Sequence, residues 1–415
     1  MKYPNIIGRE VEISTLERLY KSKKSEFVAI YGRRRIGKSY LVSEVYGSKI
    51  VFTAVGTYVK DGDKNYETYR KLQLDHFYDS LIMSGLDATA TERPTCWREA
   101  YLLLRRLLEG IHSRRKVILI DELPWLAGPQ SSEMISELGY FWNSWADSQR
   151  NIILVVCGSA TSWMLDNVIR DYGGLHGRLT ETIKLSPFTL AECQKYYRRN
   201  GFRLSRYEMC ISYMALGGVP FYLDKLRNSQ TITENIDRIF FADEKIHQEF
   251  MDVYAGLYAS KERYVDIVKV LGSQFYGMTQ KEISTAIDVK SGGTLTKLLE
   301  NLMESGIIRA FVSNSTHTPA RGTPPSPPRL AKSRASAPAA PSSPPDPSER
   351  HPRRRPRALS HTPSAASPPA RPWSLATEGT QERPEQNFSV HHFNRIKLSS
   401  GTVPILNITF SIQIE

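Results

Sequence analysis

Short, continuously apolar segments alternate with amphipathic segments through the first half of the chain. EFVAIYG (26–32) and IVFTAVG (50–56) are apolar runs that end in glycine, and GKSYLVSEVYG (37–47) between them has helical spacing. Two such runs on either side of an amphipathic segment are typical of a β-strand, α-helix, β-strand unit. The pattern therefore predicts an α/β arrangement.

Three more apolar runs of strand type follow at longer intervals. They are KVILIDE (116–122), NIILVVCGS (151–159) and TIKL (182–185), and a helix with apolar residues at every third or fourth position is predicted at 97–111. Strands that are apolar along their whole length need cover on both faces. We expect a mainly parallel sheet with helices on both sides.

The pattern changes after residue 188. From 189 to 252 it is helical with no clear strand, and the strand-like IIRAFV (307–312) follows three further helical segments. Thr279 is the predicted N-cap of the second of these helices, with Glu282 as its capping-box partner. Three helices followed by a strand favour a winged-helix domain. The three predicted helices are 263–273, 278–288 and 291–306.

Composition changes abruptly near Val312. The segment 313–387 holds 17 of the chain's 24 prolines, with Ala, Ser, Thr and Arg in most other positions. Such a segment has too few apolar side chains to offset the entropy of ordering it, so we expect it to be disordered and locally polyproline-like. The last 28 residues, 388–415, regain β-type residues, but a segment of this length forms no core alone.

The net charge of +12 is distributed unevenly over the 415 residues. Residues 313–415 hold 13 Lys and Arg against 6 Asp and Glu, which leaves 42 against 37 in residues 1–312. So small a surplus is a weak indication of nucleic-acid binding, because the electrostatic argument requires basic residues gathered on one face. The content of 40% hydrophobic and 24% charged residues is that of ordinary globular domains.

The four cysteines lie far apart and form no CxxC pair. This spacing argues against a structural zinc site and against a secreted disulfide framework. The longest apolar runs are far shorter than the roughly 20 residues that a membrane-spanning helix needs. MKYPNIIGRE lacks the apolar stretch of a signal peptide. We therefore expect a cytoplasmic protein.

The residues GRRRIGKS (32–39) match the pattern G-x-x-x-x-G-K-[S/T] between a predicted strand and a predicted helix. Gly32 and Gly37 allow the loop to curl so that backbone N–H groups face phosphate oxygens, and the helix start adds its positive dipole end. We expect Lys38 to reach the β- and γ-phosphates and Ser39 to ligate Mg²⁺ through its hydroxyl. This context disfavours the alternative, an ordinary strand-to-helix turn.

Three arginines, Arg33, Arg34 and Arg35, fill variable positions of this loop. One of them could contact phosphate. For at least two we expect side chains that extend into solvent, because the loop binds phosphate through its backbone.

Two adjacent carboxylates, Asp121 and Glu122, stand at the end of the strand KVILIDE. Neighbouring residues of a strand point in different directions, so the two can have different roles. Asp121 would hold Mg²⁺, mostly through its water shell, and Glu122 would orient and polarise the water that attacks the γ-phosphate. The alternative is that the pair caps a neighbouring helix. The phosphate loop upstream makes this alternative the weaker interpretation.

Ser159 follows Gly158 at the end of the strand NIILVVCGS. In the proposed sheet this strand would end beside the phosphate loop, where the Ser159 hydroxyl could bond the γ-phosphate or the attacking water. A serine at this position is also a common helix N-cap, and both interpretations remain open.

These elements and several flanking motifs resemble the archaeal-type ATPase family, within the STAND and AAA+ relatives of the P-loop NTPases. The resemblance covers residues 1–312 and ends at the proline-rich segment, where members of the family continue into a further domain. It implies that the strand ending at Ser159 lies between the phosphate-loop strand and the strand ending at Asp121, and that a helical subdomain and a winged helix follow. The motifs are NIIGREVEISTLERL, IYGRRRIGKSYL, VILIDELPWLA, VVCGSATSWM, LHGRLTETIKLSPFTLAE and LGGVPFYL.

The resemblance also assigns residues that spacing alone would not. Arg9, in the opening GRE motif, is implied to lie near the adenine, and Tyr40, directly after the phosphate loop, belongs to the expected nucleotide-binding set. Pro220 in GGVP matches a motif that contacts nucleotide in relatives, although this sequence would also simply end a helix. Arg178 matches an arginine that approaches the γ-phosphate of a neighbouring nucleotide, with an ordinary surface arginine as an equal alternative.

The sequence thus predicts an ATP-binding, Mg²⁺-dependent ATP hydrolase that acts as a nucleotide-driven switch on an unknown protein partner. Through Arg178 it would associate with a second copy of itself. The alternative is a nucleotide-gated DNA-binding regulator with slow or negligible ATPase activity. DNA binding is not favoured, because the third helix of 261–312 presents a nearly neutral face.

The expected parts are a P-loop ATPase domain (1–188), a helical subdomain (189–260), a winged-helix domain (261–312), the disordered segment (313–387) and a short tail (388–415).

Overall fold

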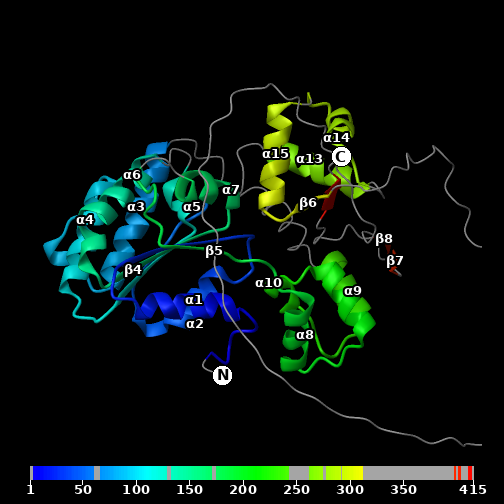
Figure 1. The fold of residues 1–415 in the computed structure, drawn as a ribbon, viewed down its shortest axis with the longest axis horizontal. Coiled ribbons are helices and arrows are strands. Elements are labelled where there is room, and N and C mark those ends of the chain that lie inside the picture. Colours follow the sequence, from blue (N-terminus) through cyan, green and yellow to red (C-terminus); the bar gives the residue numbers. More distant parts are fainter. Residues whose placement is uncertain are drawn as a thin grey trace, which may run out of the picture. The chain divides into compact units, whose positions relative to one another are not determined.

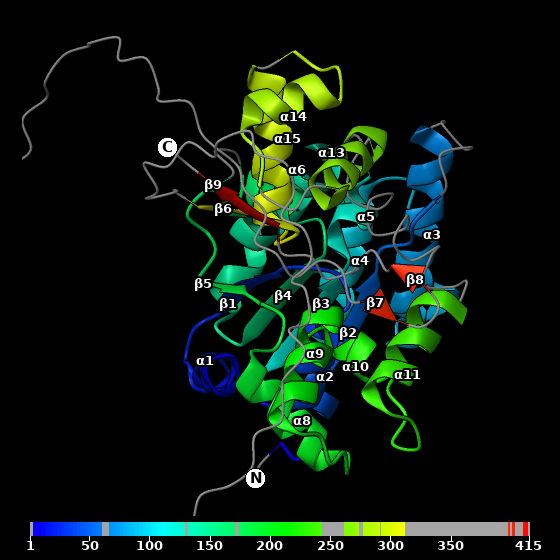
Figure 2. The ribbon, with the colours of Figure 1, turned by 90° about the vertical axis from the view of Figure 1, so that its right-hand side faces the viewer.

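The computed structural model describes residues 3–59, 66–128, 132–170, 174–242, 261–273, 277–290, 292–311, 397–398, 401–402 and 410–413. Its centre is a parallel sheet of five strands in the order β2-β3-β4-β1-β5, which can be followed across Figure 2. The strand ending at Ser159 lies between the other two site strands, as the resemblance implied. The strands are β1 (Glu26–Tyr31), β2 (Ile50–Val55), β3 (Lys116–Asp121), β4 (Ile152–Gly158) and β5 (Glu181–Lys184).

Helices cover both faces of this sheet, so the predicted α/β class is confirmed (Figure 1). Successive residues of a strand point to opposite faces. Val28 and Ile30 of β1 accordingly pack with α1 (Glu10–Lys21) and α2 (Lys38–Tyr46). Phe27 and Ala29 pack on the other face with α3 (Tyr66–Met83), α4 (Trp97–Gly110), α5 (Leu123–Ala127) and α6 (Ser132–Phe141).

The strands agree with the predicted runs to within about two residues. β1 and β2 of the predicted unit are separated in the sheet by β4 and β3. Helix α3 was not among the predicted elements, although Leu74, Phe77 and Leu81 on its buried side have helical spacing. The short helical segments are α7 (Thr161–Met164), η1 (Gly47–Lys49), η2 (Ala88–Ala90), η3 (Trp142–Ala146), η4 (Asp147–Gln149) and η5 (Leu165–Ile169).

The part after β5 is helical up to residue 242, as predicted, and residues 243–260 lie outside the described ranges. Capping boxes begin three of its helices, at Thr189, Ser205 and Thr231. Its buried side chains belong to the same apolar cluster as α1, α2 and one face of the sheet. The elements are α8 (Leu190–Arg199), α9 (Arg206–Leu216), α10 (Pro220–Leu223), α11 (Ile232–Asp237) and η6 (Arg238–Ala242).

Three further helices and strand β6 (Ile308–Phe311) build a separate apolar cluster. The capping box of Thr279 and Glu282 is present as predicted. β6 pairs in parallel with β9 (Phe410–Gln413), and β7 (Lys397–Leu398) pairs with β8 (Gly401–Thr402). The winged-helix domain stays a prediction. The helices are α13 (Lys261–Ser273), α14 (Gln280–Ala286) and α15 (Gly293–Glu304).

The predicted disordered segment, 313–387, lies outside the described residues. Among the helices that the structure does describe, none is long and apolar enough to cross a membrane.

Candidate functional site

The loop between β1 and α2 curls around the ammonium group of Lys38. Gly32 has a φ of +142°, and a Cβ there would lie 2.2 Å from the carbonyl oxygen of Leu185, so this approach requires glycine. The buried Lys38 side chain turns back, and its Nζ donates to the carbonyls of Gly32 and Arg33, both at 3.1 Å. The loop thus holds a positive charge where the motif predicts phosphate oxygens.

The charge of Lys38 is only partly compensated by its surroundings. Burial lowers the pKa of the Lys38 ammonium, and the negative charges of Glu122 and Asp121 offset part of this lowering. An anionic ligand in the loop would favour the charged form of the side chain. The site is therefore electrostatically suited to a phosphate group.

Ser39 and Asp121 meet although 82 positions separate them in the sequence. The Ser39 hydroxyl donates to Oδ2 of Asp121. The contact follows from the sheet, because the carboxyl ends of parallel β1 and β3 lie at the same edge. A hydroxyl and a carboxylate are oxygen donors of the kind that Mg²⁺ prefers, and Mg²⁺ usually takes its remaining ligands from water and substrate phosphates. The pair therefore fits the predicted metal role.

Glu122 and Ser159 are also brought together at this edge. Oε2 of Glu122 accepts from the Ser159 hydroxyl at 2.8 Å and from the Ser159 backbone N–H at 3.1 Å. Ser159 is buried and caps no helix, since Ala160 is the N-cap of α7. Glu122 is the N-cap residue of α5, but its side chain forms no cap bond. The side chains of Glu122 and Ser159 therefore cap neither α5 nor α7 in this structure.

The arginines of the loop contradict the expectation that at least two extend into solvent. All three are only partly exposed. The guanidinium of Arg34 lies 5.3 Å from the ring of Trp125, and that of Arg35 lies 3.8 Å from the ring of Phe221. Aromatic rings from α5 and α10 flank the loop, and cation–π attraction stabilises the arginines against them.

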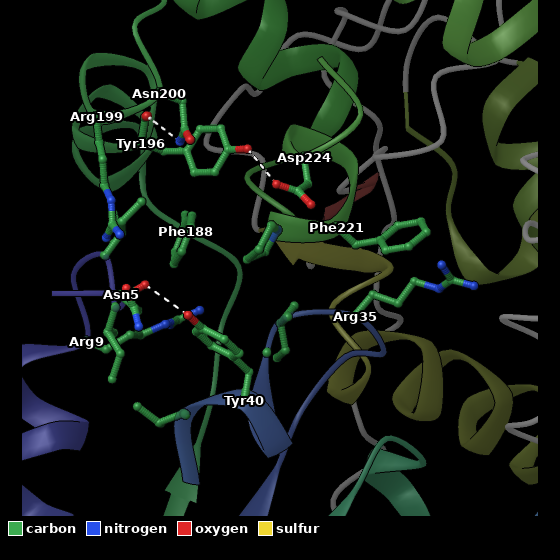
Figure 3. A pocket seen from close by; sticks show the side chains of 16 residues that line it. Asn5, Arg9, Arg35, Tyr40, Phe188, Tyr196, Arg199, Asn200, Phe221 and Asp224 are labelled. Carbon is green, nitrogen blue, oxygen red and sulfur yellow. Dashed lines mark hydrogen bonds between the residues drawn. The ribbon is translucent and has the colours of Figure 1, made fainter. Parts of the chain in front are cut away.

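A pocket of about 560 Å³ opens beside the phosphate loop (Figure 3). It gathers four residues of the predicted nucleotide-binding set, namely Arg9, Gly37, Tyr40 and Pro220. The sequence did not assign the other polar and aromatic side chains of its wall to the nucleotide site, because they come from separate parts of the chain that only the fold brings together. They are Asn5, Arg35, Phe188, Tyr196, Arg199, Asn200, Phe221 and Asp224.

Arg9 also ties the N-terminal segment to the start of the helical part. It is buried, its Nη2 donates to the carbonyl of Ser186 at 2.6 Å, and its guanidinium lies 5.0 Å from the Phe188 ring. Burial lowers the pKa of Arg9, although Glu192 and Glu12 favour its charged form. Arg9 therefore has a structural partner in addition to its place in the pocket wall.

Tyr40 of α2 and Pro220 of α10 both line the pocket. The half-exposed Tyr40 side chain donates its hydroxyl to the carbonyl of Asn5 at 3.2 Å, and this bond is drawn in Figure 3. Pro220 is the first residue of α10, where its missing N–H is tolerated. Tyr196 donates to a carboxylate oxygen of Asp224 at 3.1 Å on the side formed by the helical part.

Arg178 is not brought to the other predicted site residues. It is exposed in the segment before β5, where its backbone N–H donates to the carbonyl of Leu175 at 3.0 Å, and it does not line the pocket. Its assignment as a residue that acts on a neighbouring molecule stays a prediction.

Comparisons with known proteins agree with this geometry. Residues 6–226 match a family described as an ATPase domain predominantly from Archaea. The chain is 25% identical over 304 residues to the uncharacterized protein MJECL04 of Methanocaldococcus jannaschii; the match covers 72% of this chain and 60% of the relative's length.

One solved structure shows the same fold, and another is similar to this chain. The Walker-type ATPase PABY2304 of Pyrococcus abyssi is 22% identical, with a TM-score of 0.52 over 73% of this chain and 90% of that one. The Aeropyrum pernix ORC2 protein is 15% identical, with a TM-score of 0.46 over 74% and 88% of the two chains. Because the family match spans more than half of the sequence, the chain belongs to the ATPase domain family found predominantly in Archaea.

Proposed function

We propose that the chain binds ATP together with Mg²⁺ and hydrolyses it. The observation that carries this proposal is the meeting of four predicted site residues in two pairs, Ser39 with Asp121 and Glu122 with Ser159, at the edge of the sheet where Lys38 lies. One pair supplies oxygen ligands for a metal, the other holds a carboxylate, and the lysine supplies a buried positive charge. Membership of an ATPase domain family supports the same function.

Each residue has a distinct role in the proposed reaction. Lys38 stabilises negative charge on the β- and γ-phosphate oxygens, and Ser39 and Asp121 hold Mg²⁺, which when bound neutralises charge on the same oxygens. Glu122 orients the attacking water and polarises it as a general base. Ser159 donates to the carboxylate of Glu122 and holds it in place.

The nucleoside would occupy the pocket beside the loop. Its wall combines residues of the ATPase part, Arg9, Gly37 and Tyr40, with Pro220 and Asp224 of the helical part. A ligand bound here contacts both parts at once, so its presence can change how they are held together. This supports the proposed role as a nucleotide-driven switch.

DNA binding is the less supported role. On α15, Lys297 and Glu300 are both exposed, the Thr296 hydroxyl accepts from Gln280 at 2.9 Å, and Glu304 pairs with Arg170 at 3.2 Å. These residues give the helix face no surplus of positive charge for DNA phosphates.

Phosphate release by the purified chain tests the proposed function. Incubation with ATP and Mg²⁺ should produce inorganic phosphate in repeated turnovers, and chelation of Mg²⁺ should stop the production. Tight ATP binding without phosphate release would contradict hydrolysis and favour the nucleotide-gated regulator instead.

A further inference from the structure

Helix α3 contacts the part of the chain that carries Glu122, although no residue of α3 belongs to a sequence motif. Gln73 is fully buried on this helix. Its Nε2 donates to the carbonyl of Thr57 at 2.7 Å, and its Oε1 accepts from the Thr57 N–H at 3.1 Å. One side chain thus satisfies both backbone groups of Thr57 and fixes the chain directly after β2.

The segment of Gly56 and Thr57 packs directly on the backbone of the turn after β3, which carries Glu122. The N–H of Gly56 donates to the carbonyl of Asp121 at 2.9 Å. A Cβ at Gly56 would lie 2.3 Å from the carbonyl oxygen of Glu122 and 2.4 Å from the backbone nitrogen of Leu126. No side chain separates the two segments, so a shift of Thr57 and Gly56 is transmitted to Glu122.

A second residue of α3 holds the same turn a little further along. The Tyr69 hydroxyl donates to the carbonyl of Trp125. The Tyr69 ring covers Gly128, where a Cβ would lie 2.5 Å from Cε1 of the ring. The Trp125 ring in turn lies 5.6 Å from Tyr58 and 5.3 Å from Arg34 of the phosphate loop.

Glu122 needs such support because its backbone is strained. It has a φ of +47°, in the left-handed region that glutamate rarely adopts. Such a conformation persists only where the surrounding structure holds it, and it is common at functional sites. The direction of the Glu122 carboxylate therefore depends on what fixes the turn.

We propose that Gln73 and Tyr69 are positioning residues for Glu122, which fix the turn after β3 so that its carboxylate faces the attacking water. The proposal rests on the proposed ATP hydrolysis. Neither residue touches the nucleotide in this account, so both act on the rate of the chemical step and leave ATP affinity unchanged.

Single-turnover ATP cleavage by variants of the full chain tests this role. Gln73→Met keeps the length of the side chain and removes both bonds to Thr57, and Tyr69→Phe removes only the hydroxyl. Asn235→Leu is the matched control, because Asn235 is a buried amide that makes the same pair of bonds to the backbone of Arg227, at 3.0 and 2.8 Å, within the helical part.

Gln73→Met should slow cleavage by roughly 10- to 100-fold, as expected for a misplaced catalytic group, with ATP affinity within about twofold of the wild type. Tyr69→Phe should slow cleavage by a smaller factor, and Asn235→Leu should cleave ATP at the wild-type rate. In a Glu122→Gln background, Gln73→Met and Tyr69→Phe should have no further effect, because the group they position is already lost.

The proposal is overturned if both α3 variants cleave at the wild-type rate, if Asn235→Leu is slowed as much, or if the losses multiply with that of Glu122→Gln. Should Gln73→Met fail to fold, the comparison of Tyr69→Phe with and without Glu122→Gln decides the question. Wild-type cleavage by Glu122→Gln alone would instead overturn the proposed catalytic role of Glu122, and with it this inference.

Discussion

The buried ammonium of Lys38 is bonded to two backbone carbonyls of its own loop. Lys38→Ala should weaken ATP binding by at least roughly tenfold, since a hydrogen bond to a charged group contributes about 1.5 to 3 kcal/mol. Calorimetric titration with ATP measures this loss. Lys23→Ala, which removes an exposed lysine, serves as the control. Equal affinity of Lys38→Ala and the wild type would contradict the assignment of the phosphate site.

The Ser39 hydroxyl and the Asp121 carboxylate are already in contact in this structure. Ser39→Ala removes one proposed Mg²⁺ ligand, so the Mg²⁺ concentration that gives half-maximal phosphate release should rise several-fold. A Mg²⁺ titration at saturating ATP measures the change. Ser43→Ala, at an exposed position of the same helix, should titrate like the wild type. An unchanged titration of Ser39→Ala would exclude a direct ligand role.

At the scale of single residues, the sequence identified the side chains that carry a local motif. Lys38 and Ser39 belong to such a motif, and Asp121 and Glu122 stand at the end of an obvious strand. The bond between Glu122 and Ser159 could not be predicted from spacing, because it depends on which strands are neighbours. Asp224 and Phe221 were missed because only the folded helical part brings them to the pocket.

At the scale of elements, the phosphate loop and α10 are joined through Arg35 and Phe221. The Arg35 guanidinium lies 3.8 Å from the Phe221 ring, and the Lys225 ammonium lies 5.2 Å from the same ring. Phe221→Leu keeps an apolar side chain but removes the cation–π attraction, which contributes about 0.5 to 2 kcal/mol. If the contact couples the two elements, this substitution should reduce the protection from hydrogen exchange that ATP gives to α10.

The measurement is hydrogen exchange of α10 amides with and without ATP in both proteins. Tyr207→Leu is the control, since Tyr207 is an exposed aromatic residue of α9 that does not line the pocket. Equal protection by ATP in Phe221→Leu and the wild type would show that the contact does not transmit nucleotide binding.

The sheet was predictable because its strands are apolar along nearly their whole length. Their order was not contained in that pattern, and the family resemblance implied only that β4 lies between β1 and β3. Helix α3 was not predicted, although the buried Leu74, Phe77 and Leu81 have helical spacing. The sequence pattern gave no indication that Gln73 bonds the backbone of Thr57, because that contact depends on where α3 packs.

At the scale of the whole molecule, the exposed Arg178 is the predicted link between copies of the chain. If it completes a neighbour's site, Arg178→Ala should bind ATP normally but turn it over roughly 10³-fold or more slowly, as expected for an arginine finger. Mixing Arg178→Ala with Lys38→Ala should then restore activity, because each variant supplies the residue that the other lacks. No restoration, with turnover independent of protein concentration, would contradict action between copies.

The apolar clusters suggest which parts of the molecule respond together to the nucleotide. The helical part up to residue 242 shares one cluster with α1, α2 and a face of the sheet, whereas α13, α14 and α15 have their own. Helices that share a core with the site strands are directly sensitive to changes at the sheet edge. We therefore expect the helical part to be the first to respond to bound ATP.

The most direct test of the central claim is the behaviour of Glu122→Gln in the presence of ATP and Mg²⁺. This variant keeps Lys38, Ser39 and Asp121 but loses the base that activates water. We predict that it retains bound ATP, at about wild-type affinity, and releases phosphate roughly 100-fold or more slowly than the wild type. Phosphate release at the wild-type rate would contradict hydrolysis by this carboxylate.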